Sequence, residues 1–205
     1  MHRRELLERC LALGTLTLAG PLGMEGVARA FAASERRAPT PFCELGPFYK
    51  RKAPSSPKLR ADGDPGLPLA VVGAVFGTGG EPVPGATVEV WQTDHAGIYD
   101  LDGYRYRALL TADARGSYAI DSVMPGHYPD RVAQHVHYLV SAPGYRAITT
   151  QLYFATDPAF GGDPERNFHR DPLITSRELV RPVTLEGDPK TMRARVQFDL
   201  VLEKA

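Results

Sequence analysis

The 205-residue sequence is poor in cysteine, with Cys10 and Cys43 its only two. Cys10 lies in an N-terminal segment that we expect to be removed, so Cys43 would be alone in the mature chain and an intrachain disulfide is excluded. Stability must then come from the core and from any bound metal, unlike in small disulfide-dependent secreted domains. We interpret Cys43 as a small buried apolar side chain, because no motif around it indicates a nucleophile.

An excess of charge of either sign is also lacking, since 24 basic residues balance 24 acidic ones. No cluster of Lys and Arg follows the N-terminal segment, so no basic patch is expected that could bind nucleic acid or an acidic membrane. The expected partner is therefore a small molecule or another subunit.

No apolar run is suited to spanning a bilayer, which takes about 20 residues. The longest candidate, residues 11–24, is interrupted by Gly20 and Pro21. It follows a pair of adjacent arginines and precedes small residues, a layout typical of a twin-arginine signal peptide, with an ordinary amphipathic helix as the alternative. We predict a signal over residues 1–33, a periplasmic or secreted mature protein, and no stable membrane insertion after cleavage.

Sustained helical periodicity is missing beyond this signal, and short β-branched and aromatic runs separated by turn residues take its place. Such runs indicate strands, and their close spacing favours antiparallel pairing. We therefore predict an all-β fold, an antiparallel β-sandwich with long irregular loops. The expected strands span residues 69–76, 87–93, 106–111, 117–122, 135–142, 148–154 and 193–202.

Two stretches contain few strand signals. Residues 34–66 are rich in Pro, Gly and charged residues, and they are predicted to form an extended N-terminal arm. Residues 157–186 have a similar composition and are too long for a plain connection, which suggests a packed functional loop or a subunit contact. The predicted sandwich domain accordingly spans residues 67–205.

His135 and His137 are the sharpest local signal for chemistry. Residues two apart in a strand project from one face about 6 to 7 Å apart, so both imidazoles can reach one ion while Val136 points into the core. The pair is not specific by itself, because two surface or hydrogen-bonded histidines would show the same pattern.

Two tyrosines follow glycine-containing turns, Tyr99 in Gly-Ile-Tyr and Tyr128 in Pro-Gly-His-Tyr. Together with the histidines they would form a set of two nitrogen and two oxygen ligands. A phenol has a pKa of about 10, so tyrosine binds as phenolate where a strongly charged, oxygen-seeking ion such as Fe(III) displaces the proton. Tyrosines after such turns also pack at strand corners in purely structural sandwiches, and this alternative stays open.

Taken together, the motifs resemble those of the intradiol ring-cleaving dioxygenases, and among these the single-domain, protocatechuate-type subunits. The similarity runs from about residue 40 to the end, and the order and spacing of the motifs agree. The motifs that carry it are residues 43–49, 84–86, 88–92, 97–99, 111–113, 116–118, 125–128, 135–137 and 149–154.

The resemblance implies an enzyme that uses non-haem Fe(III) and O2 to cleave a catechol, a small aromatic diol, between its two hydroxyls to a muconate-type diacid. It implies Tyr99, Tyr128, His135 and His137 as the metal ligands, with Tyr128 as the ligand that leaves when substrate binds. No organic cofactor or external reductant would be required. Subunits of this type commonly assemble, so an oligomer of undetermined size is expected.

The resemblance also implies catalytic contributions from Arg131 and Gln151. Family members commonly have an arginine three residues before the first histidine, where this chain has Val132, so Arg131 lies one position early. A shift of one residue reverses the face of a strand. Arg131 therefore reaches the site only if the chain bulges, and otherwise Gln134 would serve in its place.

Two other functions remain as alternatives. A non-catalytic, transthyretin-like module for periplasmic binding or assembly would keep the sandwich without a stoichiometric metal. A zinc hydrolase using His135 and His137 has less support, because no Glu or Asp lies at a spacing typical of zinc peptidases.

Overall fold

The computed structural model describes residues 36–129 and 131–205. The predicted signal, residues 1–33, lies outside the described residues. Within the described part, no helix is both long and apolar enough to cross a membrane.

Strands dominate the described chain, and those outside residues 157–186 begin and end close to the predicted positions. Most are rich in β-branched, aromatic and other apolar residues, which suits a sheet with at least one face in a core. The strands are β1 (Pro68–Gly77), β2 (Thr87–Trp91), β3 (Arg107–Thr111), β4 (Ser117–Val123), β5 (His135–Ser141), β6 (Ile148–Phe154), β7 (Val180–Arg181), β8 (Thr184–Glu186), β9 (Arg193–Gln197) and β10 (Leu200–Leu202).

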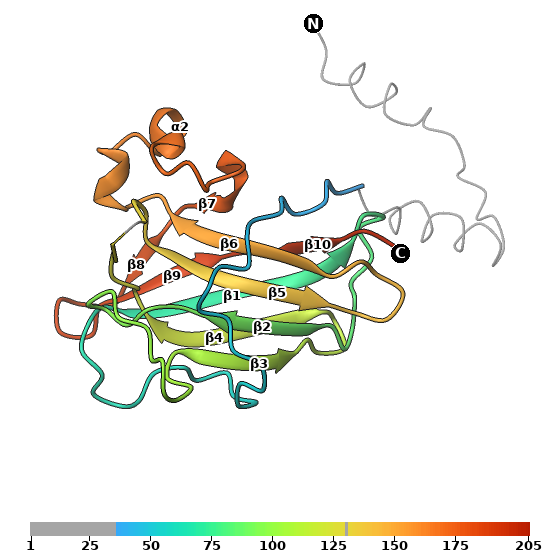
Figure 1. Ribbon diagram of the computed structural model, residues 1–205, viewed down its shortest axis with the longest axis horizontal. Coiled ribbons are helices and arrows are strands. Elements are labelled where there is room, and N and C mark those ends of the chain that lie inside the picture. The colour runs from blue at the N-terminus through green and yellow to red at the C-terminus, as the bar shows by residue number, and fades with distance from the viewer. Residues whose placement is uncertain (1–35, 130) are drawn as a thin grey trace, which may run out of the picture. The chain divides into compact units, whose positions relative to one another are not determined.

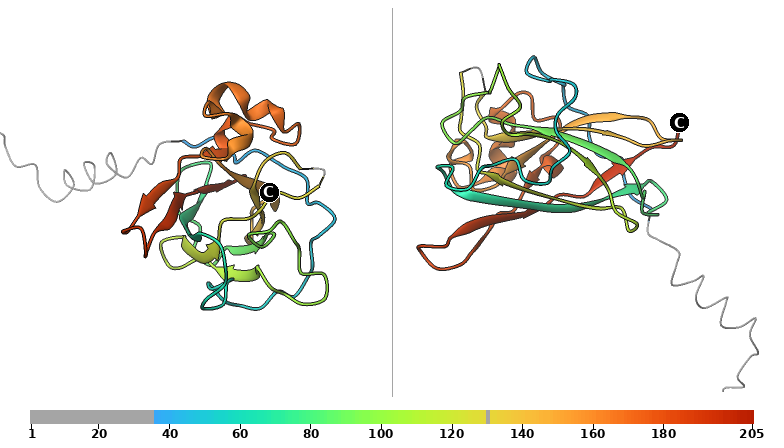
Figure 2. Two further views of the ribbon diagram at one scale, coloured as in Figure 1. Left: turned by 90° about the vertical axis from the view of Figure 1, so that its left-hand side faces the viewer. Right: turned by 90° about the horizontal axis from the view of Figure 1, so that it is seen from below.

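The strands form two five-stranded sheets, one in the order β10-β1-β9-β8 with β4 paired to β1, the other in the order β3-β2-β5-β6-β7. Figures 1 and 2 show the sheets as the two layers of a sandwich. The all-β prediction is confirmed.

The pairing is mixed rather than purely antiparallel, which corrects that part of the prediction. β1 pairs in parallel with β9 and β10, and β6 pairs in parallel with β7. Alternation of side chains reports which face is buried but not the direction of the neighbouring strand. The sequence pattern therefore could not show that the C-terminal strands return beside β1 instead of closing a hairpin.

The strand predicted over residues 193–202 is interrupted once. β9 and β10 keep a single register against β1 on either side of the break, pairing Val72 with Gln197 and Val75 with Leu200. At the break, the Asp199 carboxylate accepts a hydrogen bond from the backbone N–H of Ala74 at 3.1 Å. The Asp199 side chain thus takes the place of one backbone acceptor in the ladder.

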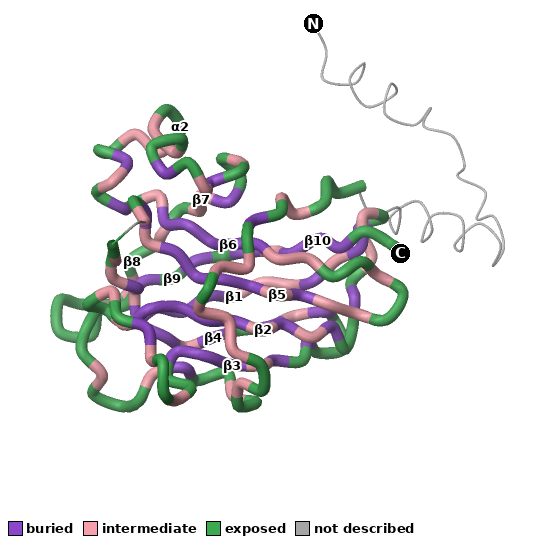
Figure 3. Tube along the Cα trace, in the orientation of Figure 1, coloured by how far each residue is buried: buried purple, intermediate pink, exposed green. Residues whose placement is uncertain are grey.

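The apolar core lies between the two sheets, and Figure 3 shows the buried strand centres in purple. Val71 and Val196 from one sheet face this core, as do Val136, Tyr138 and Val140 along β5 of the other, and all five are buried. Removing such side chains from water stabilises the fold by about 1.5–3 kcal/mol each.

Residues 36–66 contain no helix or ladder strand, and from Thr40 to Pro54 they cross the outer face of the second sheet, as the blue segment of Figure 1 shows. The backbone N–H of Cys43 donates to Thr149 of β6 at 2.9 Å, and that of Leu109 in β3 donates to Pro54 at 2.9 Å. This arm therefore covers a sheet face that a plain sandwich would leave in water.

The excursion predicted between residues 157 and 186 folds into short helical turns and β7 and β8. The turns are η1 (Pro158–Phe160), α2 (Pro164–Asn167), η2 (Phe168–Arg170) and η3 (Arg177–Leu179). Asp157 and Asp163 begin two of them as N-caps, each accepting a backbone N–H with proline following.

Candidate metal centre

The two histidines lie on the outer face of the second sheet, opposite the core. His135 pairs across the β5–β6 ladder with Tyr153, and His137 pairs with Gln151. Val136 between them faces the core and is fully buried. Strand alternation thus places both imidazoles on one face, as predicted, and both are buried, at 3% and 2% exposure.

His137 is held between an aromatic ring and the arm. Trp91 of β2 is its ladder partner, and the two rings stack with centroids 4.9 Å apart at 8°. On the arm, Gly46 has φ +74°, and a Cβ there would lie only 3.2 Å from His137 Cε1. Glycine therefore allows the arm to pass directly over the imidazole.

The two tyrosines come from loops that touch backbone to backbone. A Cβ on Gly97 would overlap the carbonyl oxygen of His127, and one on Gly126 would overlap the backbone of residues 95–97. The glycines before Tyr99 and Tyr128 therefore permit a close approach that brings the two rings to a centroid distance of 5.5 Å. This packing explains the Gly-x-Tyr spacing in structural terms.

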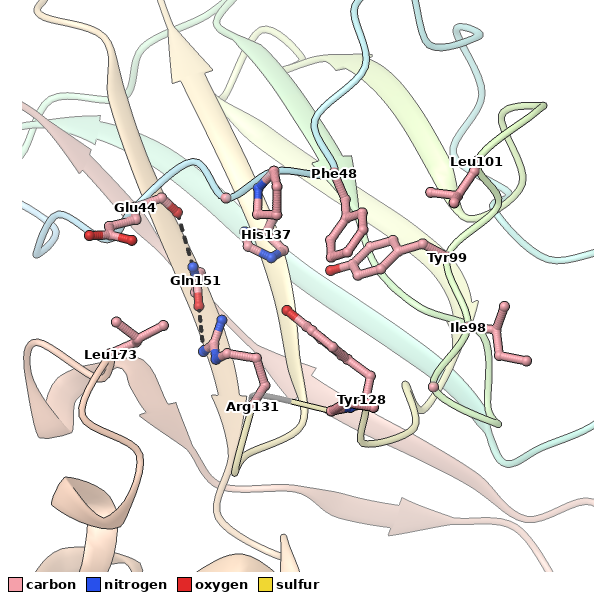
Figure 4. Close-up of a pocket in the computed structure, with 14 residues that line it drawn as sticks. Glu44, Phe48, Ile98, Tyr99, Leu101, Tyr128, Arg131, His137, Gln151 and Leu173 are labelled. Carbon is pink, nitrogen blue, oxygen red and sulfur yellow. Dashed lines mark hydrogen bonds between the residues drawn. The ribbon is translucent and has the colours of Figure 1, made fainter.

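The four predicted ligands are brought together. The Tyr128 hydroxyl lies 3.4 Å from His135 Nε2, and the two imidazole centroids lie 4.8 Å apart. In Figure 4 the hydroxyls of Tyr99 and Tyr128 and the ring of His137 point toward one space. The Tyr99 ring is itself stacked under Phe48 of the arm, 4.2 Å between centroids.

Both histidines are neutral, which is the form that binds metals. Burial, and next the nearby Arg131 charge, lower the pKa of His135 to about 3. Burial, followed by the charges of His135 and Arg131, holds the pKa of His137 well below its usual value. His135 Nδ1 lies 2.8 Å from the Ala133 carbonyl oxygen, so the proton belongs on Nδ1 and the lone pair on Nε2, which faces Tyr128 and Arg131.

The oxygen donors differ in environment. The Tyr99 hydroxyl is buried and has no hydrogen-bond partner among the described residues, whereas Tyr128 is half-buried. Burial, and next the nearby Tyr128, raise the pKa of Tyr99 well above its usual value. Only an ion with strong affinity for oxygen anions would bind such a phenol as phenolate.

This donor set fits ferric iron better than zinc. Among the described residues, no three His, Cys, Asp or Glu side chains gather in an arrangement that could hold a metal, so the tyrosines are needed to complete a site. Two neutral imidazoles and two phenol oxygens suit a hard, highly charged ion, whereas zinc normally takes Cys, His or carboxylate.

Arg131 reaches this site despite its shifted position. Its Nη1 lies 3.0 Å from His135 Nε2, and its Nη2 donates to Gln151 Oε1 at 3.0 Å and to the Tyr153 hydroxyl at 2.8 Å. Residues 131–134 precede β5 as an irregular bend, so strand alternation does not govern where Arg131 points.

The two glutamines have different surroundings. The Gln134 side chain donates to the Pro125 carbonyl at 2.7 Å, so it braces the Tyr128 loop and does not take the place of Arg131. Gln151 is 1% exposed; its Nε2 donates to the Glu44 carbonyl of the arm at 3.0 Å, and its Oε1 accepts from Arg131 and from Tyr153. Gln151 therefore links the arm to the arginine.

Two buried carboxylates in the excursion were not predicted. Asp171 accepts from Arg131 Nε at 3.3 Å and from the backbone N–H of Ala133 at 3.1 Å. Asp157 lies 2.9 Å from His127 Nε2 and accepts from the backbone N–H of Gln134 at 2.6 Å. Both Asp residues are followed by proline, which signals a turn start, but no sequence signal indicated which loop they would hold.

A cavity of about 550 Å³ opens onto these side chains. Its inner part is lined by Tyr99, Tyr128, Arg131, His137 and Gln151. The rest of the lining is mostly apolar and comes from the arm, from the Tyr99 loop and from the excursion, as Figure 4 shows. The arrangement can bind a metal ion and a flat organic ligand side by side.

Comparison with known proteins gives a consistent picture. A family model described as "Dioxygenase" matches residues 45–204. Catechol 1,2-dioxygenase 2 of Acinetobacter lwoffii is 34% identical over 149 residues, which cover 60% of this chain and 54% of that protein. Hydroxyquinol 1,2-dioxygenase of Rhodococcus opacus is 34% identical over 187 residues, covering 77% of this chain and 62% of that protein. The chain thus spans little more than half the length of these relatives.

Solved structures agree in fold. The dioxygenase domain of a dioxygenase carbohydrate-binding protein fusion from Streptomyces sp. SirexAA-E is 33% identical with a TM-score of 0.70, and the match covers 82% of this chain and all of that one. The catechol 1,2-dioxygenase of Acinetobacter radioresistens is 28% identical with a TM-score of 0.69, covering 90% of this chain and 70% of that one.

Proposed function

Because the chain belongs to the intradiol ring-cleavage dioxygenase family, we propose that it uses a non-haem ferric ion and O2 to cleave a catechol between its two hydroxyls, giving a muconate-type diacid. The observation that carries this proposal is the convergence of two neutral imidazoles and two phenol oxygens, three of which, from His137, Tyr99 and Tyr128, belong to residues that line a mostly apolar cavity.

In this proposal Tyr99, Tyr128, His135 and His137 hold the iron. When bound, Fe(III) would draw electron density from the chelated diol and make its ring reactive toward O2. The Ala133 carbonyl keeps the proton of His135 on Nδ1, so Nε2 would be the iron-binding nitrogen once iron takes the place of the Arg131 contact at 3.0 Å. Trp91 stacks on the His137 ring and Gly46 packs against its Cε1, which limits rotation of the ring and fixes the direction of its nitrogens.

The two tyrosines have different proposed roles. Tyr99 is stacked under Phe48 and buried, so it stays in place through the reaction. Tyr128 is half-buried and sits on a loop at the cavity, so it can swing away when the diol binds. A diol that binds as a dianion releases two protons; the phenolate oxygen of Tyr128 can take up one of them as it leaves, and the other passes to solvent.

Arg131 and Gln151 shape the charge around the bound diol. The guanidinium lines the cavity beside His135, where it can stabilise negative charge that develops on the substrate oxygens. Gln151 fixes its direction through Oε1 and keeps the arm closed through Nε2. The apolar lining excludes water and leaves these contacts unscreened.

Metal analysis with a visible spectrum tests the ligand set. We expect about one iron per chain and a visible tyrosinate-to-iron absorption band in the purified protein. Tyr99→Phe should weaken or shift the band, whereas Tyr104→Phe, a change on the exposed rim of the same loop region, should not. An iron-loaded protein without the band would contradict the tyrosine ligands.

Oxygen consumption tests the reaction. Catechol should consume one O2 per ring, with formation of a muconate-type ultraviolet absorbance. A transthyretin-like binding module predicts neither iron in stoichiometric amount nor O2 consumption, so the two readouts separate these functions.

We further propose export of the mature protein to the periplasm or the medium, and assembly into an oligomer. Residues 1–33 support export through their paired arginines and apolar run. Replacing both arginines with lysine should keep the precursor in the cytoplasm in a cell-fractionation assay. Size-exclusion chromatography with light scattering gives the oligomeric state.

A further inference from the structure

Two large apolar side chains are exposed at the mouth of the cavity. Ile98 and Leu101 are 64% and 65% exposed, and both line the cavity beside Tyr99 (Figure 4). Exposed apolar side chains that gather at the rim of a ligand site are typical of contact with an apolar part of the ligand.

The loop that carries them is held by hydrogen bonds on both sides. The Asp94 carboxylate accepts the backbone N–H groups of Ala96 and Ile98 at 2.9 Å each. Beyond Tyr99, the Asp100 carboxylate accepts the N–H of Gly103 at 2.7 Å. Ile98 and Leu101 are therefore presented in a fixed arrangement before any ligand binds, which lowers the entropic cost of binding.

A cation that could bind a substrate carboxylate is missing from this mouth. Among the described lining residues, Arg131 is the one Lys or Arg, and its guanidinium is already bonded to Asp171 and to other site residues. Lys50, near the loop, donates to the carbonyl oxygens of residues 101–103. The other charged lining residue, Glu44, is exposed and lies across the cavity from Ile98 and Leu101, with its carboxylate directed away from the cavity in Figure 4. It supplies no positive charge to a substrate carboxylate.

The cavity is also large enough for a diol that carries a ring substituent. At about 550 Å³ it lies within the range of sites that enclose ligands of several ring or chain units. An unsubstituted catechol, held at the inner end by the metal ligands, would leave the apolar mouth in contact with water. A substituent reaching past Tyr99 would cover Ile98 and Leu101.

We propose that the preferred substrates are catechols with an uncharged, apolar ring substituent, and that catechols with a carboxylate in that position are disfavoured. This inference rests on the proposed ring cleavage and adds the class of substrate. The apolar mouth supplies the gain in affinity, and the carboxylate would lose water without meeting a cation.

The test compares two substituents of similar shape and different charge, 4-isopropylcatechol and 3,4-dihydroxybenzoate. Dissociation constants are measured without oxygen on the iron-loaded full chain, and kcat/KM is then measured in air. We expect 4-isopropylcatechol to bind about tenfold more tightly than catechol, and 3,4-dihydroxybenzoate to bind about 10- to 100-fold more weakly than 4-isopropylcatechol. Equal or tighter binding of the carboxylate would overturn the proposal.

Variants assign the effect to the mouth. Ile98→Ser combined with Leu101→Ser should lower the ratio of affinities for 4-isopropylcatechol and catechol to near one. Leu185→Ser, which changes an exposed leucine outside the cavity, is the matched control and should leave this ratio unchanged. A ratio unaffected by the mouth variant would contradict the assignment.

The anaerobic measurement separates this inference from the proposed function. If the diols bind in the expected order but no catechol consumes O2, the proposed ring cleavage is wrong, while the preference of the site for diols with an apolar substituent is supported. If catechol is cleaved but the affinities of the two substituted diols are reversed, the substrate class alone fails.

Discussion

Around His135 and His137, the two faces of the sheet β3-β2-β5-β6-β7 are both buried, but by different means. The inner face meets the opposite sheet through apolar side chains such as Val136 and Tyr138. The outer face carries His135, His137 and Gln151, and irregular chain from the arm and excursion covers it. Burial of the inner face stabilises the fold, whereas burial of the outer face removes polar groups from water and must be compensated group by group.

Compensation on the outer face takes two forms. The histidines lose their charge, because burial lowers their pKa values. Arg131 keeps its charge and is bonded to the buried carboxylate of Asp171. The outer face therefore presents neutral nitrogen donors that can bind an ion. Changes on this face should affect metal binding, whereas changes on the inner face should affect the free energy of unfolding.

The largest effect is expected from His137→Ala on the outer face. Loss of a proposed iron ligand should remove the metal and lower kcat/KM by more than about 100-fold, beyond the usual effect of a residue that only supports a ligand. Metal analysis and O2 uptake check this result. His169→Ala, an exposed histidine outside the cavity, is the control and should retain iron. Retention of iron and activity by His137→Ala would exclude the proposed centre.

Asp171→Ala tests the cover of the outer face. It would leave Arg131 buried without its carboxylate and free the backbone N–H of Ala133, so we expect a loss of about 3–5 kcal/mol in the free energy of unfolding. Urea denaturation measures it. Asp62→Ala removes an exposed carboxylate paired with Lys58 and should leave the free energy of unfolding almost unchanged. Equal losses would mean that Arg131 does not depend on Asp171.

The comparison also separates what the sequence could predict from what it could not. Alternation along β5 was sufficient to assign Val136 to the core and both histidines to one outer face. The cover could not be predicted in this way, because the arm and excursion have no periodicity. The position of Arg131 depends on the bend before β5, and its link to Asp171 joins residues 40 positions apart.

The same limitation explains the errors in topology. Apolar alternation over residues 193–202 correctly indicated a strand, but the break at Asp199 depends on a hydrogen bond to Ala74, 125 positions away in the chain. The short strands β7 and β8 have burial patterns without alternation, so they had no strand signal of their own.

Val136→Ala probes the inner face. Deleting two methyl groups from a fully buried site should lower the free energy of unfolding by about 2 kcal/mol, through lost burial and a residual cavity. The variant should still bind iron, since Val136 faces away from the site. Val132→Ala, at a 44% exposed position nearby, is the matched control and should change stability by less than about 0.5 kcal/mol. Loss of bound iron by folded Val136→Ala protein would contradict the separation of the two faces.

The smallest effect, per pH unit and per histidine, is expected from pH acting on the metal-free protein. His135 has a pKa of about 3 in the folded state, against about 6.5 when unfolded. Between these values the unfolded chain binds the additional proton, so stability falls as the pH decreases below about 6.5, by up to about 1.4 kcal/mol per pH unit for each such histidine, and it gains nothing further above that value. Urea denaturation at pH 7.5, 6.5 and 5.0 measures the slope while most carboxylates remain ionised. His135→Gln should show a shallower slope than the wild-type protein, and parallel slopes would mean that the imidazole is not held neutral by the cover.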